Sequence, residues 1–400
     1  MERIAEWFTE AEVVTLTQEM IRIPSDWNQP LREKHVLDYI CRFLDKHGIE
    51  YRISPVEDQR YNIIATYRGQ DPVNGKSLLL NGHVDTVPAY EMEFAPFEGF
   101  LEGGYIHGRG AVDMKGAVAA MIMALVVCKR ANIALAGDLI FTAVVGEEGR
   151  SEGTESLVLQ GFKADGAIVG EPSNFDFAIG HRGLEWIELI VHGKIAHSGV
   201  AEQGINAIRN ATKLITALDA ELGPKLQERF NPYTGPSILN YGRIEGGTQP
   251  STVADKCKIQ IDRRYLPGET LDQVTVEIQA VIDQLAAEDP EFRAELTFME
   301  ENAMTKLAHV PMMTDPSDEV VSTLTKSITN VTGRTPTMST RRGWTDGGLL
   351  SHYLGIPTVI CGPGDISYSH AKNERIAVEQ LVQAVEIYVQ TAVRFCGMVK

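Results

Sequence analysis

Short apolar runs alternate with amphipathic stretches along the first part of the chain. The apolar runs at 77–80, 138–145 and 167–169 predict strands, and the segments at 116–129 and 155–160 predict helices. Strands that alternate with helices are typical of an α/β layer with a mostly parallel sheet. An apolar run at 357–361 and a helical pattern from about 378 to 395 repeat this arrangement near the end of the chain. Both ends are therefore expected to form one domain.

The middle of the chain has a different rhythm. It predicts, in order, a strand at 184–191, a helix at about 204–222, strands at 237–241 and 256–265, and a helix at 271–287. A β-α-β-β-α-β order of this size is typical of a ferredoxin-like α+β module. We expect residues 181–295 to form such a module, inserted into a discontinuous domain made of residues 1–180 and 296–400.

Composition excludes several classes of protein. Hydrophobic residues make up 44% of the 400 residues, as in ordinary globular proteins. Lys and Arg number 37 against 54 Asp and Glu, a net charge of −17, which disfavours binding to nucleic acid or to an anionic membrane surface. The five cysteines are odd in number and form no CxxC pair, so neither a disulfide framework nor a cysteine-rich zinc module is expected.

The chain carries no pattern of a targeting or membrane segment. The start, MERIAEWFTEAEVV, is acidic and helical, unlike a signal peptide. The longest apolar stretch, 117–128, is too short to span a bilayer and predicts a buried helix. A cytoplasmic protein is expected.

Histidines and carboxylates follow several of the predicted strands. The residues that share this placement are His83, Asp85, Glu147, Glu148, Glu171 and His370, and Asp113 stands just before a predicted helix. In an open α/β sheet, sites are built beyond the carboxyl ends of the strands, so these side chains are expected to meet.

This set of donors suits metal ions. Imidazoles and carboxylates without a thiolate favour one or two ions of the Zn, Co or Mn kind. Two ions roughly 3.5–4 Å apart need a bridging ligand, and Asp113 has two oxygens to offer. Of the neighbours Glu147 and Glu148, one can bind metal while the other accepts a proton from water, and Asp85 can orient the imidazole of His83.

Five motifs together make the chain recognisable. GHVDTVP, GRGAVDMKG, GEEG, GEPS and the late SH before NE resemble the metallopeptidase and deacylase family of acetylornithine deacetylase, succinyl-diaminopimelate desuccinylase and carboxypeptidase G. The motifs occur in the family's order over nearly the whole chain. The resemblance implies a catalytic domain that holds two zinc ions, with cobalt or manganese as alternatives, interrupted by a lid domain that commonly forms a homodimer.

The resemblance also implies a role for each site residue. His83 and Glu171 resemble the ligands of one metal, Glu148 and His370 those of the other, and Asp113 the bridge. Glu147 resembles the general base and Asp85 the acid that orients a ligand. In HGKIAHSG, His197 resembles the family histidine that reaches the reacting carbonyl, often from the partner subunit.

The substrate side is less distinctive. By alignment with the family's Asp-x-Arg-like strand, Arg264 is expected to bind a substrate carboxylate, while its neighbour Arg263 is structural or solvated. The loop RGWTDGGLL resembles the substrate-side loop of the family, which places Thr345, Gly347 and Gly348 at the pocket. The turn GGTQPSTVAD departs from the desuccinylase pattern and argues against a succinyl-diaminopimelate substrate.

The resemblance implies an enzyme that hydrolyses linear amides with metal. We expect an acetylornithine deacetylase-like amidohydrolase acting on an N-acyl amino acid or a short peptide with a free carboxylate. A carboxypeptidase or dipeptidase of the same family is the nearest alternative, and a ligand-binding relative that lacks catalysis is a further one. A serine hydrolase is disfavoured because no GxSxG motif is present.

Overall fold

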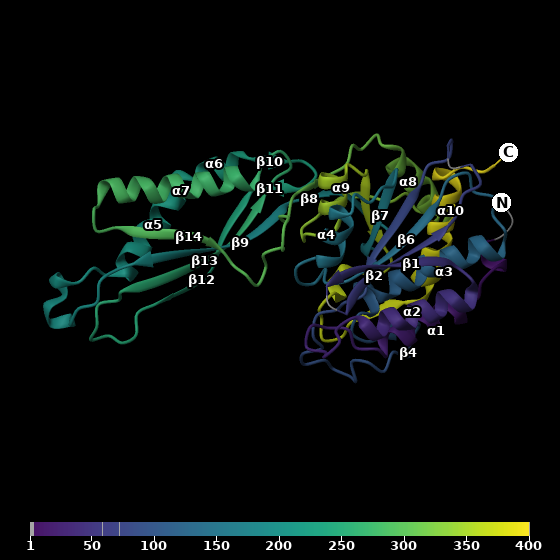
Figure 1. The fold of residues 1–400 in the computed structure, drawn as a ribbon, viewed down its shortest axis with the longest axis horizontal. Helices are drawn as coiled ribbons and strands as arrows, with labels where there is room; N and C mark the ends of the chain where they lie inside the picture. Colours follow the sequence, from purple (N-terminus) through teal and green to yellow (C-terminus); the bar gives the residue numbers. More distant parts are fainter. Residues whose placement is uncertain (1–3, 58, 72, 400) are drawn as a thin grey trace. The chain divides into compact units, whose positions relative to one another are not determined.

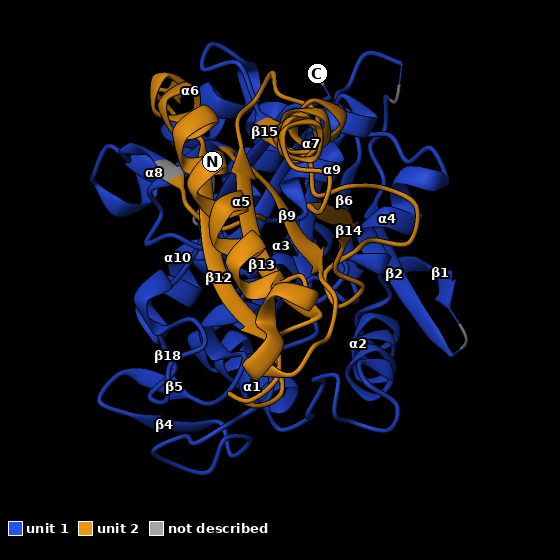
Figure 2. Ribbon diagram, turned by 90° about the vertical axis from the view of Figure 1, so that its left-hand side faces the viewer, with its two compact units in different colours: residues 1–180, 313–340, 345–400 blue, residues 181–312, 341–344 orange. Residues whose placement is uncertain are grey.

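The chain folds into two compact units. The computed structural model describes residues 4–57, 59–71 and 73–399. Unit 1 comprises Met1–Gly180, Met313–Thr340 and Thr345–Lys400, and unit 2 comprises His181–Met312 and Arg341–Trp344, as Figure 2 shows. Each unit is described separately below.

A nine-stranded sheet forms the centre of unit 1 (Figure 1). Its strand order is β1-β2-β6-β3-β7-β17-β8-β15, with β16 paired to β8. The strands are β1 (Glu50–Glu57), β2 (Arg60–Tyr67), β3 (Leu78–His83), β6 (Leu139–Val144), β7 (Gly166–Pro172), β8 (Phe177–His181), β15 (Met312–Met313), β16 (Met338–Arg341) and β17 (Thr358–Gly362). The central strands β6, β3, β7 and β17 are parallel, and antiparallel strands flank them.

The central strands are apolar because both faces of the sheet are covered. Every residue of β3, β6, β7 and β17 is buried, as expected for parallel strands between helices. The parallel register pairs Leu78 of β3 with Leu139 of β6 and Gly166 of β7, so the three strands begin at the same level. Their carboxyl ends therefore meet at one edge.

Helices of unit 1 pack on this sheet and on one another. They are α1 (Glu10–Ile21), α2 (Lys34–His47), α3 (Gly116–Arg130), α4 (Glu152–Leu159), α8 (Glu319–Thr332), α9 (Gly347–Leu354) and α10 (Val378–Phe395). Helix α10 packs against α3 and α8, and α4 packs against α9. The unit also contains a small sheet of β18 (Arg375–Ala377), β5 (Tyr105–His107) and β4 (Phe100–Glu102). Its short helical segments are the 3₁₀ helices η1 (Ile4–Glu6) and η4 (Ile366–Tyr368) and the π-helix η2 (Ala111–Lys115).

Helix α3 corrects one argument from the sequence. Because η2 continues into α3, the apolar element spans Ala111–Arg130, which is long and apolar enough to cross a membrane. The length of residues 117–128 therefore does not exclude a span. The most apolar 18-residue window of the element is entirely buried within the fold, as in the core helix of a globular protein.

Unit 2 is built on a four-stranded antiparallel sheet. Its strands β9 (Gly183–His192), β12 (Ile238–Gly246), β13 (Lys256–Tyr265) and β14 (Arg293–Phe298) lie in the order β12-β13-β9-β14. Helices α5 (Ala207–Glu221) and α7 (Leu271–Glu288) connect them in a β-α-β-β-α-β sequence. The short elements η3 (Ser198–Gln203), α6 (Gly223–Glu228), β10 (Phe230–Asn231) and β11 (Gly235–Pro236) complete the unit.

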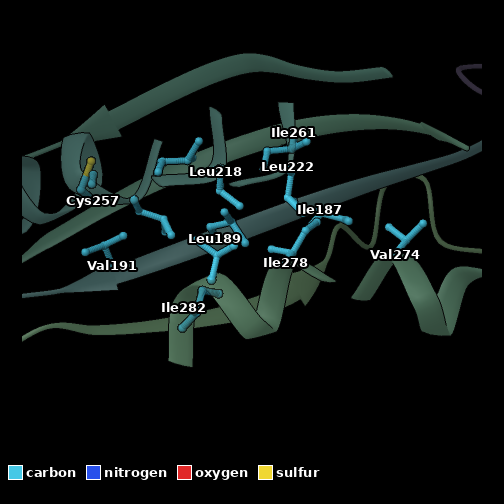
Figure 3. Packing of buried hydrophobic residues seen from close by; sticks show 14 of the residues in the cluster. Ile187, Leu189, Val191, Leu218, Leu222, Cys257, Ile261, Val274, Ile278 and Ile282 are labelled. Carbon is cyan, nitrogen blue, oxygen red and sulfur yellow. The ribbon is translucent and has the colours of Figure 1, made fainter. Parts of the chain in front are cut away.

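Alternation along the strands of unit 2 divides its sheet into a covered and an open face. Residues of β13 alternate between buried and partly exposed positions. The buried set packs with α5 and α7 into one core, where Ile187, Leu189 and Ile261 of the sheet lie with Leu218 and Ile278 of the helices (Figure 3). Arg264 lies on the opposite face, because it alternates with the buried Arg263.

The edges of unit 2 differ from the expected range 181–295. Position 295 falls inside β14, whose residues pair with β9 as far as Phe298. The unit runs on to Met312 because His309 pairs with Leu184. Trp344 belongs to the same unit, with its ring centroid 4.7 Å from that of His309.

Candidate active site

The site lies at the carboxyl edge of the central strands of unit 1. His83 is the last residue of β3, and Glu171 is the last but one of β7, so both are held by the sheet itself. Glu147 and Glu148 follow β6. The parallel register described above brings these three chain segments to the same level.

The turn after β6 is shaped by a glycine and a buried aspartate. Gly146 has φ +79°, a left-handed conformation that favours glycine, and a Cβ there would lie 1.9 Å from Glu152 Oε2. The Asp85 carboxylate accepts hydrogen bonds from the backbone N–H of Glu147 (3.2 Å) and of Glu148 (2.9 Å). Asp85 thus orients the two glutamates, a role that the sequence did not indicate.

Asp85 also faces His83, as predicted, but mainly through its backbone. The Asp85 carbonyl oxygen lies 3.0 Å from His83 Nδ1, whereas its carboxylate Oδ1 lies at 3.6 Å. With Nδ1 turned to these acceptors, Nε2 is directed to the carboxylates of the site.

Asp113 lies between the two candidate ligand histidines. Its Oδ1 is 3.2 Å from His83 Nε2, and its Oδ2 is 3.3 Å from His370 Nε2. The residue is buried in η2, where its φ of −124° interrupts the helix. One carboxylate that offers each oxygen to a different imidazole is the geometry a bridging ligand requires.

Possible metal-ligand atoms at the site form two groups, and both groups include His83. His83 Nε2 lies 3.6 Å from Glu171 Oε1 and 3.9 Å from Glu147 Oε2, and donor atoms of these three residues lie within 4.8 Å of one another. His83, Asp113 and Glu148 form a second such group. His370 Nε2 lies 2.9 Å from Glu148 Oε1, and the His370 side chain is half exposed.

Burial of many carboxylates dominates the electrostatics. Burial, with the charge of Glu171, raises the pKa of Glu147 well above its ordinary value. Burial and the charge of Asp113 raise the pKa of Glu148 to about 7. Hydrogen bonds to Asp113 and Glu148 raise the pKa of His370 to about 10. Burial opposes ionisation of Asp113, but hydrogen bonds from His370 and His83 lower its pKa.

These residues fit divalent cations. Five carboxylates with two imidazoles give a site with excess negative charge, and repulsion among the carboxylates adds to burial in raising the pKa values of Glu147 and Glu148. Cations bound among the donor atoms would offset this repulsion. Nitrogen and oxygen donors without a thiolate are the ligands of catalytic Zn²⁺, Mn²⁺ and Co²⁺ sites.

Two buried acids near the site were missed from the sequence. Asp346 precedes α9, accepts a hydrogen bond from the Thr154 hydroxyl (2.7 Å), and has its pKa raised to about 7 by burial. Glu374 is fully buried, and burial raises its pKa to about 7 as well. The final motif residue of SYSHAKNE was the only sign of Glu374.

The predicted substrate loop is internally bonded. Thr345 is fully buried and its hydroxyl accepts a hydrogen bond from Gly347 N (3.2 Å). Gly347 and Gly348 are buried at the start of α9. Their contact with a substrate stays a prediction.

The other predicted residues belong to unit 2. Arg263 is buried and donates hydrogen bonds to Ser237 Oγ (2.7 Å) and to Glu269. Its guanidinium is therefore bonded to residues of its own unit. Arg264 is partly exposed and pairs with Asp262 through two hydrogen bonds of 2.8 and 3.1 Å. His197 is exposed, and its Nδ1 accepts a hydrogen bond from Gly199 N (3.0 Å). The neutral imidazole then carries its proton on Nε2.

A parallel α/β sheet with imidazoles and carboxylates gathered at its carboxyl edge is an arrangement that metal-dependent hydrolases can use. Sequence comparison makes the assignment specific. The sequence model of Peptidase family M20/M25/M40 matches residues 79–394, and the chain belongs to this family of hydrolytic enzymes that act on amides. The recognition from the five motifs is thereby confirmed.

Curated relatives cover nearly the whole chain. N-formyl-4-amino-5-aminomethyl-2-methylpyrimidine deformylases of Bacillus subtilis and Halalkalibacterium halodurans are 29% and 30% identical, each over 97% of this chain and 96% and 95% of their own length. The acetylornithine deacetylase of Myxococcus xanthus is 27% identical over 89% of this chain and 87% of its own.

Solved structures show the same fold. Aminopeptidase PepT from Bacillus cereus has a TM-score of 0.78 at 23% identity, covering 98% of this chain and all of its own. The YXEP protein of Bacillus subtilis, described as a dinuclear metal binding peptidase from the M20 family, has a TM-score of 0.70 at 16% identity, covering 98% and 99%.

Proposed function

We propose that the protein is a two-metal amidohydrolase that removes the acyl group from a small N-acylated compound, with N-acyl amino acids as the first candidate substrates. The observation that carries this proposal is the convergence of His83, Asp113, Glu148 and Glu171 with Glu147 in two groups of donor atoms, each within 4.8 Å.

Two divalent ions, zinc or else cobalt or manganese, would be held by side chains from several segments of unit 1. His83 and Glu171 would bind one ion and Glu148 and His370 the other, with Asp113 between them. When bound, such ions polarise the scissile carbonyl and make the attacking water more acidic. The 3.2 and 3.3 Å distances from the Asp113 oxygens to the two imidazoles support the bridging role.

Glu147 would act as the general base. It accepts a proton from the attacking water and later delivers it to the leaving amine, because the same carboxyl must be base and then acid. Asp85 supports this role by holding the Glu147 backbone N–H. Burial and the charge of Glu171 raise the pKa of Glu147, as suits a carboxyl that must take up a proton.

His197 would stabilise the oxyanion that develops on the carbonyl. Its Nδ1 accepts a hydrogen bond from Gly199 N, so Nε2 carries the hydrogen and can donate it to an anion. We propose that unit 2 serves as a lid and dimerisation module, and that His197 acts on the active site of a partner subunit.

Arg264 would bind the carboxylate of an amino acid substrate. Its planar guanidinium suits a two-bond contact with a carboxylate, and it makes such a contact with Asp262. Thr345, Gly347 and Gly348 would line the pocket of such a cytoplasmic enzyme. A carboxypeptidase or dipeptidase would use the same machinery and differ in the acyl group.

A second candidate substrate comes from the relatives. The deformylases, with 29–30% identity over 97% of the chain, act on the N-formyl amide of an aminopyrimidine, according to their names. Such a substrate has no carboxylate for Arg264 to bind.

A hydrolysis screen separates these possibilities. The purified protein, supplied with zinc, cobalt or manganese, is assayed on N-acetyl and N-succinyl amino acids, dipeptides and N-formyl-4-amino-5-aminomethyl-2-methylpyrimidine. Turnover of acylated amino acids above the other compounds supports the first candidate, and preference for the pyrimidine supports the second. Absence of hydrolysis with every metal and substrate class would contradict the proposal.

A further inference from the structure

We propose that Glu374, held by Arg109, is a positioning residue that fixes the bridging aspartate between the two metal sites. The inference rests on the proposed two-metal function and assigns a task to the Gly-Arg-Gly turn and to the final acid of the SYSHAKNE motif. Neither residue is itself a candidate ligand.

Glu374 binds the backbone of the segment that carries Asp113. Its Oε1 accepts hydrogen bonds from the N–H groups of Val112 (3.0 Å) and Asp113 (3.2 Å). These amides lie in the first turn of η2, where N–H groups have no acceptor within the helix. The carboxylate of Glu374 therefore replaces helix acceptors and holds the Asp113 backbone in place.

Arg109 secures the other oxygen of the same carboxylate. Its Nη1 lies 2.5 Å from Glu374 Oε2, and the two side chains are 2% and 0% exposed. Backbone hydrogen bonds also hold the segments that carry the pair: Arg109 N donates to Pro96 O (2.8 Å), and Gly108 N donates to Glu374 O (3.2 Å). Because both ends of the carboxylate are bonded, it has little freedom to turn.

The same chain segment also presents His370. Glu374 follows His370 by four residues, and His370 has a left-handed φ of +61°. The Nε2 atom of His370 lies 3.3 Å from Asp113 Oδ2. Glu374 thus ties the segment of one candidate ligand to the backbone of another, 261 residues away in sequence. Loss of this tie should alter the spacing of Asp113 and His370.

A second buried ion pair of unit 1 provides a matched control. Glu33 accepts two hydrogen bonds from the Arg60 guanidinium, at 3.0 and 2.8 Å, and the two side chains are 3% and 8% exposed. Glu33 and Glu374 are similarly buried and each pairs with a buried arginine, and Arg60 also pairs with Glu57 and Glu152. Glu33 lies at the start of α2 and not on the Asp113 segment.

The test compares metal binding by Glu374→Gln and Glu33→Gln. The glutamine side chain has the shape of glutamate but turns an NH₂ donor toward either the two backbone amides or Arg109. We expect Glu374→Gln to weaken binding of at least one Co²⁺ or Zn²⁺ by roughly 10–100-fold in competition titrations, as for other residues that support ligands. The visible spectrum of the Co²⁺ protein should change as well. Glu33→Gln should bind both ions and give the wild-type spectrum, although its melting temperature falls comparably.

Wild-type affinity and spectrum in folded Glu374→Gln would overturn the proposal, as would an equal loss of affinity in Glu33→Gln. If Glu374→Gln does not fold, Glu374→Asp decides instead. It keeps the charge but is one methylene too short to reach both Arg109 and the amides, so the same loss is expected, and unchanged affinity would overturn the proposal. A wild-type protein that binds no divalent ion would refute the proposed function itself. Two bound ions without hydrolysis of any amide tested would refute the proposed hydrolase function and leave the positioning role of Glu374 standing.

Discussion

At the scale of single residues, the adjacent acids Glu147 and Glu148 differ in what surrounds them. Glu148 Oε1 lies 2.9 Å from the imidazole of His370, whereas Glu147 faces His83 at 3.9 Å and the negative charge of Glu171. The sequence predicted a division of labour between neighbours. The family resemblance also implied that Glu148 and His370 share a metal, and the fold brings these two side chains together.

The first prediction concerns these two acids. Glu147→Gln should lower kcat by roughly 10²–10⁴-fold, the usual contribution of a general base, while metal content stays at the wild-type level. Glu148→Gln should lose metal together with activity. Steady-state kinetics and elemental analysis of both variants check this, and a loss of metal from Glu147→Gln with none from Glu148→Gln would reverse the two roles.

The second prediction concerns the partly exposed arginine of unit 2. Arg264→Lys should raise KM by roughly tenfold, about 1.4 kcal/mol, for substrates with a free α-carboxylate, because lysine lacks the bidentate fork. Esterified or amidated analogues of the same substrate serve as controls and should be unaffected. Equal losses on both kinds of substrate would remove Arg264 from carboxylate recognition.

At the scale of elements, periodicity predicted the regular parts well. The range expected for β13 (256–265) and that expected for α10 (378–395) agree with the observed bounds, and the other predicted strands and helices of the core differ by a few residues. Strands β1, β2 and β8 and helices α2, α8 and α9 were not predicted. Strand β8 follows β7 after four residues and ends at His181, where the sequence predicted the boundary between the two domains.

Capping and charge networks act at this scale too. Glu269 joins the end of β13 to the start of α7 by accepting hydrogen bonds from Leu266 N (2.6 Å), Arg229 (2.7 Å) and Ser237 Oγ (3.1 Å). Burial opposes its ionisation, yet these bonds and the charge of Arg263 lower its pKa below the ordinary 4.5. A carboxyl with a lowered pKa stabilises the fold above its unfolded-state pKa, and this stabilisation is lost as the pH falls through the folded-state pKa.

The third prediction follows from this network. At pH 7, Glu269→Gln should lower the stability of β13 and α7 by about 2 kcal/mol, and the difference from wild type should shrink as the pH falls below about 4.5. Hydrogen exchange of amides in these two elements is the measurement. Glu245→Gln, which breaks the exposed pair with Arg243, is the control and should cost less than about 0.5 kcal/mol. A difference independent of pH would contradict the titration of Glu269.

At the scale of the whole molecule, the site draws on segments far apart in sequence. The sequence identified the ligand candidates because each stands in a short motif, either after a strand or, for Asp113, just before a helix. It could not identify the partners of Asp85 or Glu374, because they lie 62 and 261 residues away and depend on how the loops fold. The family match confirms the hydrolase class.

The fourth prediction is an active site shared between subunits. If each site uses His197 from a partner, mixing inactive His197→Ala with inactive Glu147→Ala should restore activity. In the mixed dimer one site then carries both lesions and the other carries none. The mixture must be made under conditions that exchange subunits, with each variant alone as control. Continued inactivity of a verified mixed dimer, or a monomeric active enzyme, would refute the shared site.

The central claim, an amide hydrolase that depends on two metal ions, is tested most directly by metal content measured together with activity. Elemental analysis of the purified protein should find two divalent ions per chain. Removal by a chelator should abolish hydrolysis, and zinc, cobalt or manganese should restore it in proportion to occupancy. Full activity in protein shown to contain no metal would contradict the account.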